Sequence, residues 1–141
     1  MNTTTKKKKF SLLSILIGLA IIGVLIALLI PTYRTYKSRA NYTKIVNVAA
    51  FYKQTVNHCF KRTHHHLEHC ALGHHGIPHR VRRHDRRYIK SIDISKGVIV
   101  IIPKTHRGIL EEDTLVYIPN IQNAELAWTA AGKSVEKGYA N

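Results

Sequence analysis

The chain has 141 residues, with 22 lysines and arginines against 8 aspartates and glutamates, and its formal net charge is +14. The part from Thr32 onward holds 18 of the basic and all 8 of the acidic residues, hence +10. Such a surface favours polyanions, meaning nucleic acid, acidic polysaccharide or anionic lipid headgroups, and charge alone does not distinguish them. Two cysteines are too few for a disulfide scaffold but sufficient for one bridge.

A basic leader at residues 1–9, which ends in four consecutive lysines, precedes a long apolar segment. Phe10 to Ile30 is a run of 21 residues without a charge. As a helix rising about 1.5 Å per residue it is roughly 31 Å long, which matches the hydrocarbon core of a bilayer. Because basic flanks stay cytoplasmic, we predict one transmembrane span at 10–30 with the rest of the chain outside the cytoplasm. A cleavable secretory signal fits less well, since its apolar region is shorter and ends in a small-x-small site.

The residues that follow Pro31 predict a continuation of the same helix with an amphipathic pattern. Apolar residues recur there at steps of three and four: Tyr42, Ile45, Ala49, Tyr52 and Val56. Pro31 removes one backbone donor and crowds the preceding turn, so we expect a kink there rather than a helix end. The prediction is one helix from about Phe10 to about Asn57, with an amphipathic half at 31–57 whose apolar stripe needs a cover.

Four short segments rich in β-branched and aromatic residues predict antiparallel strands that provide this cover. The expected strands are 88–94, 98–102, 114–118 and 125–130, in a β head spanning 88–141. Connections this short suit a meander, and the expected fold is α+β, with the long helix packed on a four-stranded antiparallel sheet. Tyr117 and Trp128 are interpreted as core residues rather than binding residues.

The N-terminal segment resembles that of type IV pilins, and the resemblance extends into the head, where it is closest to the short-headed pilins of Gram-negative bacteria. At the N-terminus it is carried by Phe10-Ser11-Leu12-Leu13, Gly23, Pro31, Tyr33 and Tyr36. In the head it is carried by Cys59, Cys70-Ala71, Gly76-Ile77-Pro78, Trp128-Thr129, Gly132, Gly138 and Tyr139. The resemblance implies an inner-membrane subunit with its N-terminus in the cytoplasm and its head in the periplasm or on an extracellular pilus.

The resemblance also implies processing and assembly. A prepilin peptidase would cut between Lys9 and Phe10, the new terminus would be N-methylated, and the pilus assembly machinery would bring the helices of other pilin subunits together. Two positions depart from the family pattern. Lys9 stands where the family has Gly before the cut, and Ser14 stands where it has a Glu that pairs with the cationic mature terminus. These departures favour a minor or atypical subunit.

Nine of the ten histidines lie between His58 and His84, in a segment at 58–87 that is expected to be a loop. His65, His66 and His69 are spaced so that a helix would place them on one face, where they could bind zinc, nickel or copper. The alternative is a solvated basic loop. A bridge between Cys59 and Cys70 is the default in an oxidising periplasm, and the alternative is that the two thiolates join histidines on a metal.

Six basic residues follow within eleven positions and are candidates for binding DNA or another polyanion: Arg80, Arg82, Arg83, Arg86, Arg87 and Lys90. The alternative is a loop kept soluble by charge. We find no paired-carboxylate site, nucleophile motif or phosphate loop in the sequence, so no enzyme and no required cofactor is predicted. The leading hypothesis is a pilin-like structural subunit. The alternatives are a membrane-tethered polyanion receptor, for example in DNA uptake, and a periplasmic metal-binding protein.

Overall fold

The computed structural model describes residues 11–141, and its first element is α1, Leu12–Arg62. The predicted long helix is confirmed, although Phe10, where it was expected to begin, lies outside the described residues. α1 continues through Pro31, and the predicted kink there remains a prediction. The helix ends five residues later than expected because its apolar periodicity persists to Cys59 and Phe60, both buried. The chain divides into two compact units after Thr35.

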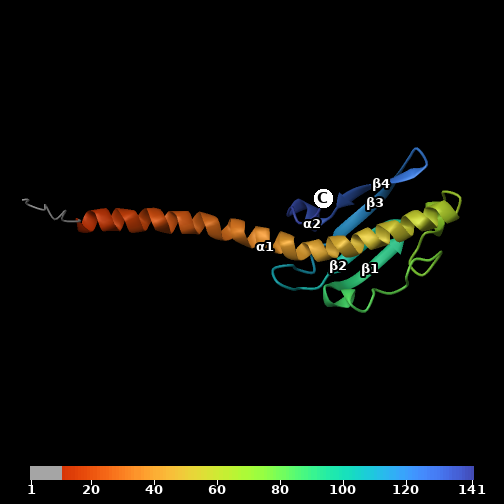
Figure 1. Ribbon diagram of the computed structural model, residues 1–141, viewed down its shortest axis with the longest axis horizontal. Helices are drawn as coiled ribbons and strands as arrows, with labels where there is room; N and C mark the ends of the chain where they lie inside the picture. The colour runs from red at the N-terminus through yellow and green to blue at the C-terminus, as the bar shows by residue number, and fades with distance from the viewer. Residues whose placement is uncertain (1–10) are drawn as a thin grey trace, which may run out of the picture. The chain divides into compact units, whose positions relative to one another are not determined.

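The head contains the predicted four-stranded antiparallel sheet, whose strands follow one another in the order β1-β2-β3-β4 (Figure 1). The strands are β1 Ile89–Ser95, β2 Val98–Pro103, β3 Leu115–Gln122 and β4 Glu125–Ala131. Each strand pairs with the next along the chain, which confirms the meander. A bulge between Ile89 and Ser91 interrupts the otherwise regular alternation of buried and exposed side chains in β1.

The connection between β3 and β4 differs from the prediction. A loop was expected at 119–124, but β3 runs on through Pro119 to Gln122, and the hairpin closes through the two residues Asn123 and Ala124. Both have positive φ, 50° and 62°, as a tight two-residue turn with the right twist requires. Pro119 did not end the strand because it lies opposite Trp128 of β4, beyond Tyr117, where the pairing of β3 with β2 ends, so its missing N–H interrupts no pairing with β2.

The core of the head lies between the outer half of α1 and one face of the sheet. The predicted apolar stripe is confirmed, since Tyr42, Ile45, Ala49, Tyr52 and Val56 are each at most 1% exposed. Alternate strand residues face them: Ile92, Ile94, Ile99, Ile101, Leu115 and Tyr117. Trp128 lies at the margin of this core, half-buried, with its ring edge-on to Tyr117 and its indole N–H without a hydrogen-bond partner among residues 11–141.

The segment expected to be a loop at 58–87 is fastened to the head at several points. Cys59 and Cys70 form a disulfide, with Cα atoms 5.8 Å apart and both side chains buried. The predicted bridge is therefore present, and the alternative in which both thiolates bind a metal is wrong. Beyond the bridge, the backbone N–H of Leu72 donates to the carbonyl of Ile94 at 3.0 Å, and that of Gly97 donates to the carbonyl of Cys70 at 2.9 Å. The segment thus packs along the outer edge of β1.

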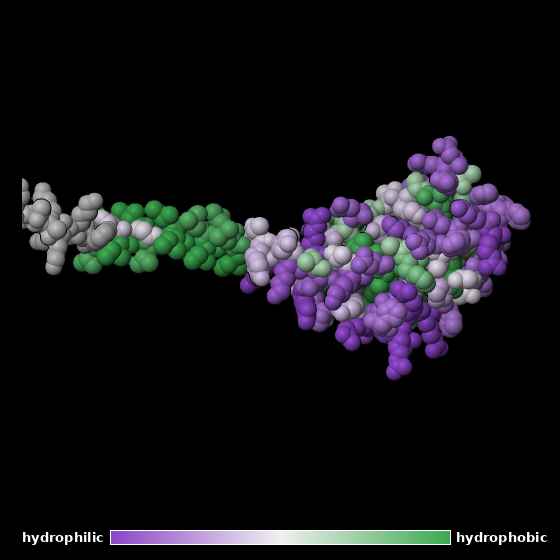
Figure 2. Space-filling model, in the orientation of Figure 1, coloured by the Kyte–Doolittle hydropathy of each residue, from purple (hydrophilic) through white to green (hydrophobic). Residues whose placement is uncertain are grey.

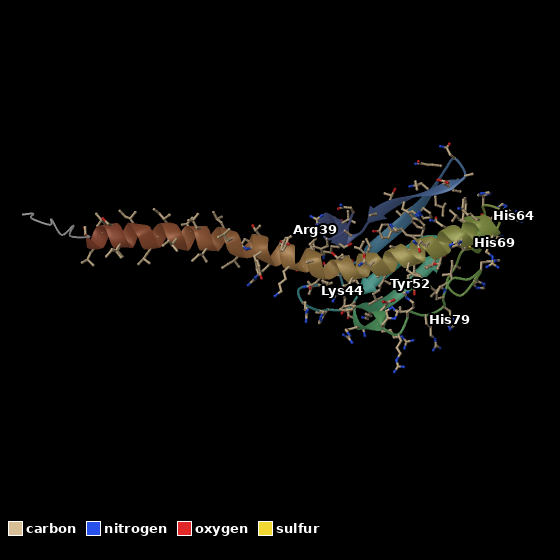
Figure 3. The ribbon with its side chains drawn as sticks, in the orientation of Figure 1. Arg39, Lys44, Tyr52, His64, His69 and His79 are labelled. Atoms are coloured by element: carbon tan, nitrogen blue, oxygen red, sulfur yellow. A yellow bond between two sulfur atoms is a disulfide. The ribbon has the colours of Figure 1, made fainter. Side chains whose placement is uncertain are left out.

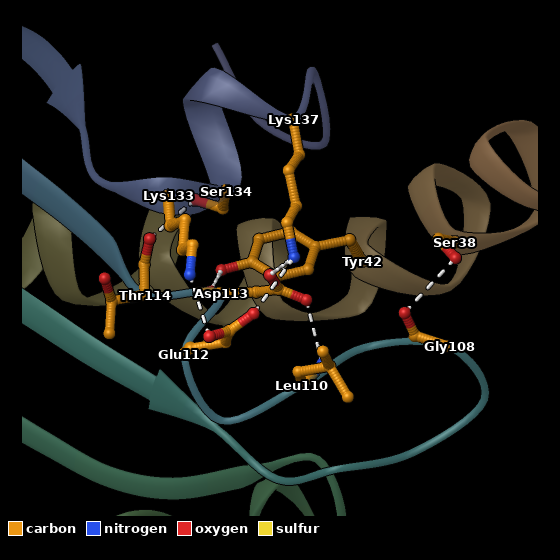
Figure 4. A network of polar contacts seen from close by, with 10 residues as sticks. All are labelled: Ser38, Tyr42, Gly108, Leu110, Glu112, Asp113, Thr114, Lys133, Ser134 and Lys137. Atoms are coloured by element: carbon orange, nitrogen blue, oxygen red, sulfur yellow. Dashed lines mark hydrogen bonds and ion pairs between the residues drawn. The ribbon is translucent and has the colours of Figure 1, made fainter.

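A polar network ties the C-terminal residues to α1 (Figure 4). Its centre is Asp113, which is fully buried and whose carboxylate accepts the backbone N–H of Leu110 at 2.8 Å and pairs with the Lys137 ammonium. The hydroxyl of Tyr42, from α1, donates to the Asp113 carbonyl at 2.7 Å. The short helix α2, Lys133–Glu136, which the sequence did not predict, is held by its Ser134 hydroxyl donating to Thr114.

Replacing Tyr42→Phe should destabilise the head by about 1 kcal/mol, because the Asp113 carbonyl loses its buried donor.

Burial raises the pKa of Tyr42 to about 12. A phenol whose pKa is higher in the folded state contributes its full stability below pH 10 and loses it as pH rises through about 12. The variant should therefore lose less stability than the parent between those pH values in thermal unfolding. Tyr36→Phe, at an exposed tyrosine, is the control and should change neither quantity.

Reducing the Cys59–Cys70 disulfide should lower the free energy of unfolding by roughly 3 kcal/mol, since it closes a loop of about 12 residues in the unfolded chain. The thermal midpoint measured with and without a thiol reductant tests this. The Cys59→Ala/Cys70→Ala variant should unfold at the lower midpoint under both conditions. Equal midpoints for the oxidised and reduced wild type would contradict a stabilising role.

Candidate functional site

The first described unit exposes a continuous apolar helix surface. Every large apolar side chain from Leu12 to Ile30 is exposed, with exposed fractions between 48% for Ile30 and 79% for Leu12. α1 is the one helix among the described residues that is long and apolar enough to cross a membrane. Figure 2 shows this segment as mostly hydrophobic, with a few paler atoms among the green ones. A surface of this kind is stable only inside a membrane or against other apolar helices.

Small and polar residues punctuate this apolar surface. Gly18 and Gly23 have no heavy atom within 4 Å of the position that a Cβ would occupy, so a neighbouring helix could approach the backbone closely there. Ser14 is exposed, and the sequence places no charge between Lys9 and Arg34. A hydroxyl costs less than a carboxylate in an apolar environment but cannot form an ion pair. The candidate processing residues Lys9 and Phe10 lie outside the described residues.

The predicted polyanion-binding residues divide into those with acidic partners and those without. The Arg82 guanidinium donates to the buried Asp85 carboxylate at 2.8 Å and stacks on the Phe51 ring, 4.0 Å from its centre. Lys90 pairs with Glu111. The other four are exposed and have no acidic partner in the described part of the chain: Arg80, Arg83, Arg86 and Arg87. Arg82 and Lys90 therefore each pair with an acidic side chain of the head. Fewer of the six predicted residues are available to bind a polyanion than the sequence suggested.

The exposed Arg87 belongs to an open groove of about 480 Å³ between α1 and the segment 82–88, which we call the basic groove. Its lining residues are Lys44, Asn47, Val48, Arg82, His84, Asp85, Arg87 and Tyr88. Lys44 projects from α1 (Figure 3), and its ammonium donates to the Tyr88 hydroxyl at 3.1 Å. The nearby Lys44 ammonium, with Arg87 as a smaller contributor, lowers the pKa of the Tyr88 phenol.

Lys44 and Asn47 line the groove but were not among the residues predicted to bind a polyanion. In the amphipathic pattern they are polar positions between the apolar positions of the helix. Their one available signal was that they lie on one helical face three residues apart. The partner segment, 82–88, is nearly forty positions away along the chain, so only the tertiary structure brings the two together.

The predicted metal-binding set of His65, His66 and His69 is not assembled on one helical face. α1 ends at Arg62, and the backbone N–H of His65 then donates to the carbonyl of Phe60, with the His65 ring packed edge-on at 4.9 Å from the Phe60 ring. Figure 3 shows His64 and His69 near this end of the helix. Residues 11–141 contain no group of three His, Cys, Asp or Glu side chains placed to hold a metal ion.

Comparison with known proteins gives two relatives and no matching family model. The chain is 29% identical over 126 residues to prepilin peptidase-dependent protein D of Escherichia coli strain K12. The aligned region covers 88% of this chain and 82% of that relative. It is 34% identical over 73 residues to type IV pilus subunit protein TapA of Aeromonas hydrophila, or about half of each chain, 52% and 51%. With the long apolar helix and the antiparallel sheet, these similarities support a type IV pilin-like protein.

Proposed function

We propose that this chain is a structural subunit of a type IV pilus or a related filament, of a minor or atypical kind. The observation that carries the proposal is the apolar half of α1, whose large side chains are all exposed, in a chain similar to a prepilin peptidase-dependent protein. One apolar surface serves two states, because it is stable in the membrane before assembly and against the helices of other subunits afterwards. The partners are other pilin subunits, the prepilin peptidase and the assembly machinery.

Two residues make the subunit atypical. A long cationic side chain at Lys9 fits poorly in a peptidase site shaped for Gly, so cleavage before Phe10 is expected to be slow. Ser14 lacks the carboxylate that would attract the new cationic terminus of a neighbouring subunit. Both features favour a subunit present in few copies over one that forms the bulk of a fibre.

The mass of the N-terminal peptide, measured on protein extracted from its native membrane, tests this proposal. We expect a species that begins at methylated Phe10, and we expect the same species in sheared filaments. Lys9→Gly should increase the cleaved fraction, because it restores the small residue before the cut. A chain found only with its lysine leader, in the membrane and absent from filaments, would contradict a role as a filament subunit.

A second candidate function is polyanion binding, with DNA as the test ligand. The exposed arginines without acidic partners in the described part of the chain favour it, since each can neutralise one phosphate. Arg82 is not included, because it is paired with Asp85 and stacked on Phe51. This function is compatible with the first, since a filament subunit can also present a basic surface.

Replacing Arg80, Arg83 and Arg86 with Gln should reduce the retention of labelled DNA and make the remaining retention less dependent on salt, because fewer counterions are released. The control is Arg39→Gln/Lys61→Gln/Lys96→Gln, which removes three charges from exposed residues outside the basic stretch. Retention that is unchanged by the Arg80→Gln/Arg83→Gln/Arg86→Gln variant would rule out this surface as a DNA receptor.

A further inference from the structure

The basic groove brings together several hydrogen-bond donors that are not neutralised. Lys44 and Arg87 are exposed, and neither forms an ion pair with an acidic side chain in residues 11–141. The Lys44 ammonium lies 3.1 Å from the Tyr88 hydroxyl oxygen and 4.8 Å from the centre of the Tyr88 ring. Because that oxygen accepts from Lys44, the Tyr88 O–H remains available to donate to a ligand. Asn47 adds a side-chain amide to the same lining.

The one carboxylate of the groove does not cancel this positive charge. Asp85 has a side chain that is 8% exposed, and its two oxygens are engaged by Arg82 at 2.8 Å and by His84 Nε2 at 3.2 Å. The lining thus holds three permanent cations, Lys44, Arg82 and Arg87, against one buried and already paired anion. The lining therefore has a net positive charge, and because the groove is open to solvent an anion can enter it.

The chemistry of these donors suits a tetrahedral oxyanion. A guanidinium, an ammonium, a phenol O–H and an amide can each bond to a different oxygen of one phosphate group, and charged donors form the stronger of these bonds. The groove is open at the surface rather than enclosed, so a phosphate that is part of a long chain can also enter. Arg80, Arg83 and Arg86 lie outside the groove in the same basic stretch and can meet further phosphates of such a chain.

We propose that the basic groove binds one phosphate group of a nucleic acid backbone, with Lys44 and Arg87 contacting the phosphate oxygens and Tyr88 donating its hydroxyl. This inference rests on the second candidate function and names the site within it that fixes the position of the polymer. The surrounding exposed arginines supply attraction that depends on charge alone, whereas the groove supplies a defined geometry.

The test is a titration of the full-length, isotope-labelled protein in uncharged detergent with inorganic phosphate at constant ionic strength. The NMR signals of the Asn47 side-chain amide and the Tyr88 backbone amide should shift and saturate. Lys44→Gln/Arg87→Gln should weaken the phosphate affinity roughly tenfold or more. Arg80→Gln/Arg83→Gln removes the same charge outside the groove and should change the affinity less than about twofold. Tyr88→Phe keeps the ring and should give an intermediate loss of roughly threefold.

A second measurement identifies the source of the phosphate by comparing a short oligothymidylate with vesicles of phosphatidylglycerol. We expect the groove variant to lose more oligothymidylate binding than the matched control, and inorganic phosphate to compete with that binding in the wild type. Binding to the vesicles alone would replace nucleic acid by a lipid headgroup and overturn the proposal. Equal losses in the two double variants, without saturable shifts, would show diffuse attraction and overturn the groove site while leaving the second candidate function intact.

Discussion

The constraint on which the rest of this structure depends is that a single helix must satisfy two environments. The segment from Leu12 to Ile30 presents apolar side chains on every side of the helix, so this half of α1 has no polar face that would be stable in water. The half from Tyr42 to Phe60 is apolar along one stripe only, and the sheet covers that stripe. The change from one pattern to the other, within an unbroken helix, separates a segment for lipid or neighbouring helices from a segment that forms a core.

The head compensates for its small size with specific fastenings. A sheet of four short strands and half a helix bury a limited apolar area, and domains of this size are marginally stable. The disulfide between Cys59 and Cys70 joins the end of α1 to the segment along β1. At the opposite end of the buried stripe, the buried Asp113 accepts from Leu110 and binds Lys137, while Tyr42 reaches its carbonyl. Both ends of the helix stripe are therefore fixed to later parts of the chain.

The excess of positive charge is distributed unevenly between structural and exposed roles. Arg82 is half-buried against Phe51 and pairs with a buried carboxylate, so its removal would leave Asp85 without its closest cationic partner. The neighbouring Arg83 and Arg87 are exposed. Since the chain has 22 basic residues and 8 acidic ones, most of its cations have no acidic side chain to pair with.

Features that depend on local periodicity could be predicted from the sequence. The apolar run, the amphipathic stripe and the four alternating segments each repeat with the period of a helix or a strand, and each element was found. The pairing of the two cysteines was predictable for a different reason, since two cysteines allow only one bridge within the chain. For the candidate site, the sequence supplied the basic stretch and, through Arg87, one wall of the groove.

Features that depend on contacts between distant segments could not be predicted in this way and became visible only in the folded chain. Pro119 remains in β3 because pairing with β4 on one side outweighs its missing donor, and no local signal contains that partner. His65 does not lie on a helical face with His66 and His69, as was expected, because the helix ends at Arg62 and the His65 ring packs on Phe60. Lys44 lines the groove because the fold places Tyr88, 44 positions later in the chain, next to it. The packing of distant segments determines which side chains become neighbours, and the spacing of residues along the chain does not specify that packing.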